Sequence, residues 1–416
     1  MKITKDLLTA TSSLYGDSFY FLDSLNFEES FKSLTSEFQS FYPKSRIAYS
    51  YKTNYIPRLC KIVDTLGGYA ETVSDMEVDV ALAVGVDPKN IFFNGPYKKA
   101  KAIEDLLLKG GVVNADSDAD LEVICSIAAS NPQATLRVGI RCNFDIEDGV
   151  VSRFGFDFSN GDFDKALTKI LKNLNIDMVG LHCHFASRGL QSWVNASKGM
   201  LDVIRAVERK NIKPLKYVSL GGGLYGRMSS KLQQQLGISP PSFGDYAAVA
   251  AKPFAEFYKH HDEHETPELI IEPGTALAAN ALKFVAKVVN IKIIGQKSIA
   301  TLSGSSFNTN PTAGKINLPI TVFHIDESES MERYEDMDMA GYTCIESDYL
   351  YRNYSGQLSV GDFVVFDSAG SYSVVMKPPF IMPNVPILEL NKDQKVRVIK
   401  RQETFEDIFS TYQMEF

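Results

Sequence analysis

Eight short apolar segments, separated by stretches of helical spacing, constrain the fold of this chain more than any other feature. The eight segments are 46–53, 68–73, 91–95, 111–116, 135–141, 178–185, 217–223 and 268–274. Between most of them lies a stretch such as 75–85 or 197–210, in which apolar residues recur at i, i+3 and i+4. This alternation predicts an α/β fold, and eight repeats over this length predict a (β/α)8 TIM barrel. An open doubly wound sheet is the alternative.

The pattern changes after about residue 282, where strand-like runs replace the helical stretches. Four runs separated by turn residues cover 283–294, 319–325, 361–376 and 395–401, and a further one lies at 20–25. We expect loops at 303–314 and in the acidic stretch 326–338. The predicted organisation is a barrel domain over 28–275 and a C-terminal β-rich domain over 276–416, which residues 1–27 complete.

Composition excludes several classes of protein. The 416-residue chain has a formal net charge of −8, so it offers no basic surface for nucleic acid or for an anionic membrane. Its five cysteines show no paired spacing, which is typical of a reducing compartment. Residues 1–16 lack the apolar run of a signal peptide, and no apolar run is long enough to span a bilayer. We therefore expect a cytoplasmic protein.

Chemically distinctive residues stand at the ends of the predicted barrel strands. These residues are Lys52, Glu71, Arg141, His184, Gly221, Gly222, Gly223, Glu272 and Gly274. In a TIM barrel all the strand ends meet at one face, and active sites are built there. A lysine, carboxylates, a histidine and glycine-rich turns together suit pyridoxal 5'-phosphate (PLP), which needs an amine, a partner for its ring nitrogen and an anion site.

Six motifs in chain order resemble those of fold-type III PLP decarboxylases. They are YSYKTN, GLHCHFAS, GGG, IIEPGT, GYTCIESD and AGSYS, and the resemblance extends over residues 49–372. This group contains the diaminopimelate, ornithine and arginine decarboxylases, with alanine racemase a more distant relative. The resemblance implies a PLP-dependent carboxy-lyase of amino-acid biosynthesis, which removes the α-carboxylate of an amino acid.

The resemblance also implies roles for the catalytic residues of the barrel. Lys52 matches the lysine that forms the Schiff base with PLP, and Glu272 matches the carboxylate that pairs with the pyridine nitrogen. His184 matches the histidine that stacks on the pyridine ring. Taken alone, Lys52 could be an ordinary surface lysine and Glu272 a helix cap, so these roles depend on the whole set of motifs.

Other barrel residues match cofactor-binding positions of the family. Ser187 matches the hydroxyl that binds phosphate in the motif HxGS. Gly221, Gly222, Gly223 and Gly274 match the phosphate-binding turns, in which glycine lets backbone N–H groups approach an anion. Glu71 and Arg141 resemble residues that line the cofactor pocket, although either could be an ordinary ion-pair partner.

In the second domain the resemblance assigns Cys344 to protonation of the substrate carbon after CO2 leaves. Glu346 and Asp348 follow it and are expected to contact substrate, and Tyr372 is expected to reach the phosphate with its hydroxyl. In such enzymes the cysteine segment enters the active site of the partner subunit. The resemblance therefore implies a homodimer with shared active sites.

Three departures from the family bear on cofactor and substrate. Thr275 stands where the family has an arginine that pairs with phosphate, and Arg188 is a candidate to supply that charge. Ile345 directly follows the cysteine where diaminopimelate decarboxylases have glutamate. Asn310–Pro311 replaces an arginine–proline pair that binds a distal carboxylate. Together with Ser305, Asn308 and Thr309, this segment predicts a polar, uncharged distal pocket, or one shaped for a substrate on a larger carrier.

Two other functions and one other site stay open at this point. An amino-acid racemase of the same fold type is possible, although racemases of this kind place an arginine where Glu272 stands. A relative that has lost activity and regulates or binds partners is a third function. His182 and His184 could instead ligate a metal, but the neighbouring sequence offers no third or fourth ligand.

Overall fold

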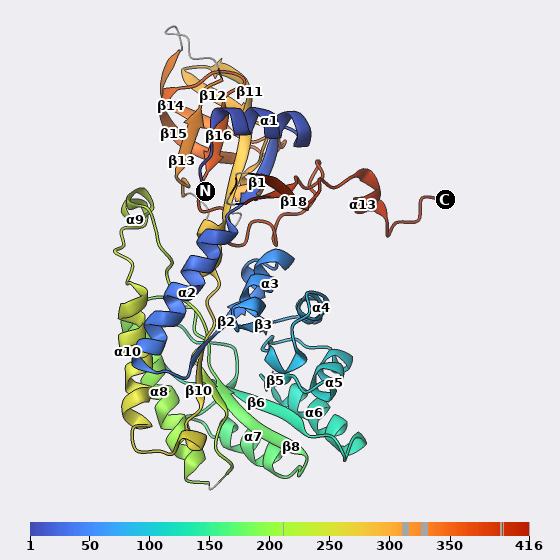
Figure 1. Cartoon of the computed structure of the whole chain (residues 1–416), viewed down its shortest axis with the longest axis vertical. Helices are drawn as coiled ribbons and strands as arrows, with labels where there is room; N and C mark the ends of the chain where they lie inside the picture. The colour runs from blue at the N-terminus through green and yellow to red at the C-terminus, as the bar shows by residue number, and fades with distance from the viewer. Residues whose placement is uncertain (211, 310–315, 326–331, 392, 394, 416) are drawn as a thin grey trace. The chain divides into compact units, whose positions relative to one another are not determined.

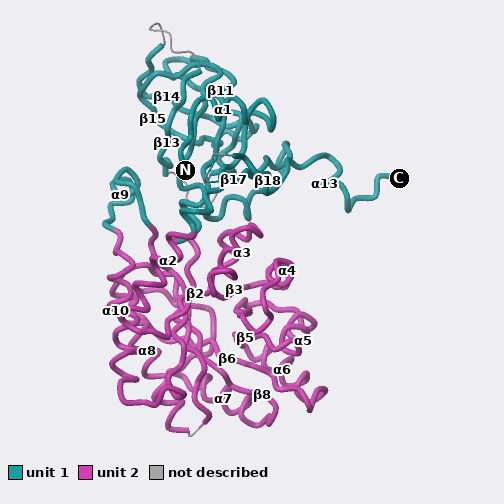
Figure 2. Tube along the Cα trace, viewed as in Figure 1, with its two compact units in different colours: residues 1–27, 227–239, 277–416 teal, residues 28–226, 240–276 magenta. Residues whose placement is uncertain are grey.

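The computed structural model describes residues 1–416 except 211, 310–315, 326–331, 392, 394 and 416. These residues form two compact units (Figure 2). The barrel unit comprises residues 28–226 and 240–276, and the β-rich unit comprises 1–27, 227–239 and 277–416. Residues 227–239, which contain the short helix α9 (Ser230–Leu236), group with the β-rich unit, whereas we expected one uninterrupted segment over 28–275.

The barrel unit holds a closed sheet of eight parallel strands, joined by a short ninth. The strands are β2 (Ser45–Ser50), β3 (Tyr69–Thr72), β4 (Ile91–Phe93), β5 (Val112–Ala115), β6 (Leu136–Asn143), β7 (Phe156–Asp157), β8 (Ile176–His182), β9 (Tyr217–Ser219) and β10 (Glu268–Ile271). Their order is β5-β4-β3-β2-β10-β9-β8-β6-β7, and β5 also pairs with β6, which closes the ring. The predicted TIM barrel is thus confirmed, and the alternative prediction of an open doubly wound sheet is wrong.

Helices surround these strands (Figure 1). The longer ones are α2 (Ser24–Phe41), α3 (Pro57–Thr65), α4 (Asp75–Ala83), α5 (Ala100–Leu108), α6 (Asp118–Ser130), α7 (Asp162–Leu171), α8 (Leu190–Glu208) and α10 (Phe243–Phe257). Short helical turns are η1 (Tyr51–Thr53), η2 (Pro88–Asn90), η3 (Glu263–Glu265), α11 (Thr275–Ala278) and η4 (Ala279–Ala281). Ser74, Ser117 and Ser242 fix the starts of α4, α6 and α10, because each side chain accepts a hydrogen bond from the first turn.

One tyrosine fills a large part of the barrel interior. Tyr217 on β9 packs with Phe92 and Val112, and its ring meets that of Phe92 edge to face at 4.9 Å between centroids. Gly180 on the adjacent strand β8 and Gly139 on β6, the next strand along, make room for it. A methyl group on Gly180 would lie 2.3 Å from the tyrosine ring, and one on Gly139 would lie 2.1 Å from its hydroxyl.

The described residues of the β-rich unit form a mixed sheet with three helices in addition to α9. Its strands are β1 (Ser18–Leu22), β11 (Leu282–Ile294), β12 (Lys297–Leu302), β13 (Ile320–Phe323), β14 (Arg333–Ala340), β15 (Tyr349–Gln357), β16 (Phe363–Phe366), β17 (Ile387–Leu390) and β18 (Val396–Lys400). The helices are α1 (Lys5–Tyr15), α12 (Ser306–Thr309) and α13 (Phe405–Phe409). The order is β15-β14-β12-β11-β1-β17-β18, with β16 joining β11 and β13.

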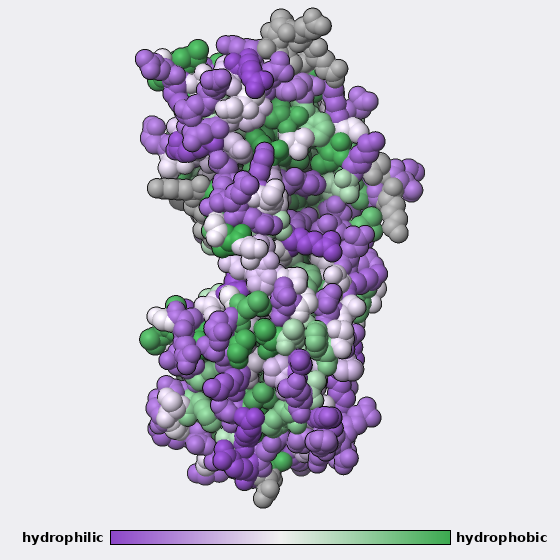
Figure 3. All heavy atoms as spheres, turned by 90° about the vertical axis from the view of Figure 1, so that its left-hand side faces the viewer, coloured by the Kyte–Doolittle hydropathy of each residue, from purple (hydrophilic) through white to green (hydrophobic). Residues whose placement is uncertain are grey.

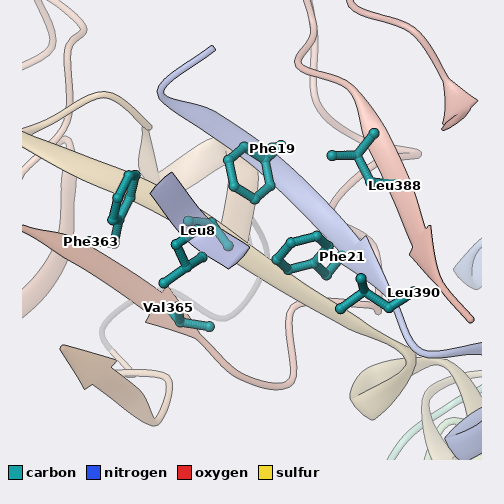
Figure 4. Close-up of a cluster of buried hydrophobic side chains, with 8 residues drawn as sticks. Leu8, Phe19, Phe21, Phe363, Val365, Leu388 and Leu390 are labelled. Atoms are coloured by element: carbon teal, nitrogen blue, oxygen red, sulfur yellow. The ribbon is translucent and has the colours of Figure 1, made fainter. Parts of the chain in front are cut away.

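The N-terminal segment completes the core of this unit. Phe19 and Phe21 of β1 point into a cluster with Leu8 of α1, Val365 of β16 and Leu388 of β17 (Figure 4). β1 lies between β11 and β17, so its backbone is hydrogen-bonded on both sides. The expected contribution of a strand near 20–25 is therefore confirmed, with the strand two to three residues earlier.

The acidic stretch 326–338 was expected to be a loop, which is wrong for its second half. Residues 326–331 lie outside the described residues, but Arg333 begins β14, which pairs with β12 and β15. Tyr334 and Met337 are buried between exposed acidic residues, and the buried Asp338 forms an ion pair with Arg352 at 2.9 Å. The acidic composition hid a strand whose buried side is interrupted by β-bulges.

The surfaces of both units mix polar and apolar side chains, as the face in Figure 3 shows. The exposed apolar side chains include Val151, Leu174 and Ile293. Among the helices that the structure describes, none is long and apolar enough to cross a membrane.

The fit between Gly180 and Tyr217 gives a test of the barrel packing. Gly180→Ala should lower the free energy of unfolding by about 1–3 kcal/mol, because the added methyl group overlaps the tyrosine ring. Denaturation by urea, followed by circular dichroism, measures this. As a control, Leu174→Ala, at a fully exposed position, should change stability by less than about 0.5 kcal/mol. A Gly180→Ala protein as stable as the native one would contradict this packing.

Candidate active site

The carboxyl ends of the barrel strands carry a buried polar cluster. Lys52 follows β2 in η1, Glu71 belongs to β3, and Glu272 follows β10. Because all the strands are parallel, their carboxyl ends share one face of the barrel. The structure brings together here the residues that we predicted from separate motifs.

The amine of Lys52 is held by Glu71. Lys52 Nζ donates to Glu71 Oε2 at 2.9 Å, and the same oxygen accepts from Ser50 Oγ at 2.5 Å. Glu71 is only 1% exposed, whereas the lysine side chain stays partly accessible. A buried carboxylate next to a reachable amine holds that amine in place while it can still meet a ligand.

The segment of Lys52 is fastened to the segment of Glu272. Ser50 N donates to Pro273 O at 3.1 Å, directly before the lysine turn. Gly274 lies so close to Thr53 that a Cβ on it would be 2.0 Å from the threonine Oγ1. Glycine is therefore required at 274 by this close approach, in addition to any contact with an anion.

Glu272 is a buried carboxylate with three donors around it. It is 3% exposed and accepts from Ser219 Oγ at 2.7 Å and from Asn94 Nδ2 at 3.0 Å, while His182 Nε2 lies 3.1 Å from its Oε2. Burial would raise the pKa of Glu272, but His182 and Lys52 outweigh burial and hold the pKa below its usual range. The group is thus an anion able to keep a proton on a nearby nitrogen.

His184 is fixed as a neutral ring. Burial, together with the charge of Lys52, lowers its pKa to about 3, although part of the residue stays accessible. Its Nδ1 accepts from Gly222 N at 2.8 Å, which leaves the proton on Nε2. Glycine is required at position 222 for this approach, because a Cβ there would lie 2.3 Å from Glu272 O.

The turn after β9 offers backbone N–H groups to an anion. Within the part of the chain that the structure describes, the amides of Gly223 and Leu224 donate to no protein acceptor. Gly223 has φ +93°, a backbone conformation that favours glycine and that can direct successive N–H groups toward one anion. Its Cα lies close enough to Ser187 that a Cβ would be 3.1 Å from the serine carbonyl oxygen. This turn, called the anion-binding turn below, is a candidate site for an anion next to Ser187.

Two side chains beside this turn differ from what we expected. The hydroxyl of Ser187 donates to the carboxylate of Asp148. The guanidinium of Arg188 lies over the ring of Tyr225, 5.4 Å from its centroid, just beyond the anion-binding turn. This chain has Thr275 where the family pattern has an arginine. The cation close to the turn is Arg188, which follows a different strand, β8.

Arg141 has a structural partner. Its guanidinium pairs with Asp116 at 3.0 Å and lies 4.5 Å from the centroid of the Phe154 ring, and both members of the ion pair are buried. Arg141 therefore has an ion-pair partner of its own, and it lies near the carboxyl end of β6 at the barrel mouth.

Several residues of the cluster were not predicted as site residues. These are Ser50, Asn94, Asn114, His182, Tyr217 and Ser219. All except Tyr217, which begins β9, are polar residues at or near the carboxyl end of an apolar strand, which is the one signal that the sequence offers. His182 was considered only as a metal ligand. Among the described residues, no group of three or more histidine, cysteine, aspartate or glutamate side chains is placed to hold a metal ion.

The β-rich unit carries the predicted site residues Cys344, Glu346 and Asp348 around a cavity of about 430 Å³. Cys344 is an exposed free thiol in its lining, and Glu346 and Lys292 line it as well. The thiol is therefore accessible to a ligand from outside this unit. Ser305, Asn308 and Thr309, expected to form a polar pocket, are buried and do not line this cavity; Asn310 and Pro311 lie outside the described residues.

Asp348 is surrounded by donors from its own unit. One carboxylate oxygen accepts from the hydroxyls of Ser305 and Ser306 and from Ser306 N, and the other accepts from Thr343 N and Oγ1. The residue is 4% exposed. These five hydrogen bonds favour a role in anchoring the turn of Cys344 over direct contact with substrate.

Tyr372 stands in a strained turn of the same unit. Its φ of +59° lies in the left-handed region, which bulky side chains rarely adopt. Neighbouring groups hold the turn, because Ser373 donates to Ala369 O and Gly370 lies against Ala278 O. Strain of this kind occurs often at functional positions, and the role of Tyr372 toward phosphate stays a prediction.

Comparison with known proteins shows the family. Residues 28–279 match the model of the pyridoxal-dependent decarboxylases, pyridoxal binding domain. The chain belongs to this family. It is therefore a PLP-dependent amino-acid decarboxylase, as predicted, and the racemase alternative is set aside.

Individual relatives are distant but cover most of the chain. Diaminopimelate decarboxylase of Methanocaldococcus jannaschii is 26% identical over 88% of this chain and 83% of its own length. The crystal structure of diaminopimelate decarboxylase from M. jannaschii in co-complex with L-lysine has a TM-score of 0.83 at 24% identity, covering 98% of this chain and 94% of that one. The Paramecium bursaria Chlorella virus arginine decarboxylase structure has a TM-score of 0.72 at 19% identity, covering 90% and 95%.

The hydrogen bonds of Asp348 give a test of the Cys344 turn. Asp348→Ala should make local opening of residues 341–348 easier by about 2 kcal/mol, because buried donors lose their acceptor. Amide hydrogen exchange in this segment should then be about thirtyfold faster. Glu346→Ala, in the same turn but exposed, should leave the exchange rates near native. Unchanged exchange in Asp348→Ala would remove the anchoring role.

Proposed function

We propose that this decarboxylase removes the α-carboxylate of an amino acid related to diaminopimelate, with PLP held as a Schiff base on Lys52. The observation that carries this proposal is the pairing of Lys52 with Glu71 at the barrel face where Glu272 is buried as an anion. The proposed substrate class is supported by relatives named diaminopimelate decarboxylase that match over most of this chain.

The residues at the barrel mouth fit PLP chemically. The cofactor needs an amine for its aldehyde, an anion for its ring nitrogen and donors for its phosphate. Lys52 offers the amine, Glu272 the anion, and the amides of Gly223 and Leu224 the donors. When bound, PLP supplies the electron sink that makes loss of CO2 from an amino acid possible.

Each protein group then has a defined task. With PLP bound, Glu272 would keep a proton on the ring nitrogen, because the three groups around this carboxylate favour its anionic form. His184, neutral and held by Gly222, offers a flat face for the ring. Glu71 orients the amine of Lys52 and balances its charge. Orientation and charge placement are the contribution of the protein.

We propose that the enzyme works as a homodimer in the cytoplasm, and that Cys344 and Glu346 of one chain complete the site of the other. Cys344 would return a proton to the substrate carbon after CO2 has left. The exposure of this thiol at the rim of a cavity of about 430 Å³ supports the proposal, because an acid that acts in a partner must be accessible from outside its own unit. Asp348 would hold this segment in place, and Tyr372 would reach the phosphate with its hydroxyl.

Chemical labelling and CO2 release test the proposed function together. After incubation with PLP and reduction with borohydride, peptide mapping should find the label on Lys52, and CO2 should be released from meso-diaminopimelate or a related amino acid. Lys52→Ala should abolish both results, because no other amine takes its place. Lys61→Ala, at an exposed lysine of α3, should change neither. A label elsewhere, or the absence of CO2 release from every amino acid of either configuration, would refute the proposal.

The cation near the anion-binding turn gives a separate test. Arg188→Ala should weaken PLP binding roughly 10–100-fold, because a charge-assisted hydrogen bond to phosphate is lost. Thr275→Arg in the same variant should restore part of the affinity, and Arg209→Ala, at an exposed position, should leave it unchanged. Fluorescence titration of the apoprotein with PLP measures each affinity. Native affinity in Arg188→Ala would show that the arginine does not contribute.

A further inference from the structure

A buried asparagine connects the two glutamates of the barrel mouth. Asn94 follows β4 and is 2% exposed. Its Nδ2 lies 3.0 Å from Glu272 Oε1 and 3.4 Å from Glu71 Oε1. Glu71 comes from the adjacent strand β3, but Glu272 comes from the end of β10, three positions away in the sheet. One amide group therefore bridges two carboxylates from different sides of the barrel.

The orientation of this amide follows from charge. Carboxylates only accept hydrogen bonds, so the NH2 end of Asn94 must face the glutamates. Its Oδ1 then faces Asn114 Nδ2 at 2.7 Å. Asn114 must in turn direct its own oxygen to Tyr217, whose hydroxyl donates to it at 2.5 Å. Burial raises the pKa of Tyr217, so this hydroxyl keeps its proton. The whole chain of donors thus points toward the two anions.

The backbone of Asn94 is held as firmly as its side chain. Its N–H donates to Thr72 O at 2.8 Å, which continues the pairing of β4 with β3. The next residue, Gly95, lies against Val73 so closely that a Cβ would be 1.9 Å from Val73 O. Asn94 cannot move away from the glutamates without breaking this approach.

We propose that Asn94 is a positioning residue that joins Glu71 and Glu272 and offsets part of their combined negative charge at the cofactor site. This inference rests on the proposed function, because the charge matters only if Lys52 carries PLP next to these anions. Asn94 touches the carboxylates that hold the amine and the ring nitrogen, and it acts through them.

Other charged and titratable groups face this pair from the surrounding strands and helices. They are Lys52 of η1, Glu77 of α4, Arg141 of β6, His182 and His184 at the end of β8, and Tyr217 of β9. Burial, to which the charge of Glu71 adds, raises the pKa of Glu77 to about 7 despite a hydrogen bond from Val73 N. Negative charge is therefore already crowded here, and two N–H dipoles from Asn94 relieve it.

Removal of these dipoles has a predictable sign. Without the positive ends of two N–H groups, the electrostatic potential at the site becomes more negative, and the protonated forms of nearby titratable groups are favoured. The pKa of the Lys52–PLP linkage should therefore rise. Asn94→Leu removes the donors, whereas Asn94→Asp also adds a third carboxylate, so the rise should be at least as large in Asn94→Asp.

The experiment follows the visible absorbance of the PLP-loaded protein as a function of pH. The apparent pKa should rise by about one unit in Asn94→Leu, and by as much or more in Asn94→Asp. Under saturating PLP, kcat should fall about tenfold or more, with KM within about twofold of native, because substrate contacts are unchanged.

Thr72→Val is the matched control. Thr72 follows Glu71 on β3, is fully buried and donates to Phe92 O at 3.1 Å, but its side chain points to the opposite face of the strand. Thr72→Val should lower the melting temperature and leave the apparent pKa at its native value. Such a result separates the charge effect of Asn94 from a general loss of stability.

The remaining outcomes are decisive as well. An apparent pKa in Asn94→Leu equal to the native value, or an equal shift in Thr72→Val, overturns the inference. If Asn94→Leu does not fold, Asn94→Asp, which has nearly the native shape, decides by the same measurement. A native protein that shows no visible absorbance with PLP overturns the proposed function, and the inference fails with it.

Discussion

The burial of two carboxylates at one end of a barrel is the constraint on which the rest of the site depends. An anion in the interior of a protein is stable only if donors and cations replace the water that it has lost. Glu71 is hydrogen-bonded by Lys52 and Ser50, and Glu272 by His182 and Ser219. Asn94 contacts both carboxylates. The identities of these residues follow from the need to keep two negative charges ionised side by side.

The parts of the site that could be predicted are those carried by local patterns. The lysine turn, the glycines after β9 and the motif of Glu272 each stand at the end of an apolar run, and a parallel barrel brings such ends together. Asn94, Asn114 and Tyr217 could not be predicted in the same way. Their contacts cross the barrel and depend on ring closure and on side-chain direction, and neither is encoded in any short stretch of sequence.

The β-rich unit shows a different limit. Composition indicated a loop over 326–338, whereas β14 begins at Arg333, because Tyr334 and Met337 alternate with charged residues and find partners on β12 and β15. Asp348 was expected at the substrate, yet it accepts hydrogen bonds from Ser305 and Ser306, far away in the sequence, and from Thr343 in its own turn. In both places, long-range contacts determine what an acidic residue does. Tyr372 differs from these acidic residues, because its own left-handed backbone conformation is unusual whatever its side chain contacts.

The slot that Gly139 and Gly180 leave for Tyr217 has a consequence for how this barrel can change over time. The ring fills the interior, and its hydroxyl ends the chain of donors that reaches Asn94, so a single side chain serves both packing and charge. A smaller residue at 217 would leave a void that only larger residues at 139 and 180 could fill, and the hydroxyl would still be missing. These three positions can therefore be exchanged only as a set, which makes this layer of the barrel resistant to stepwise drift.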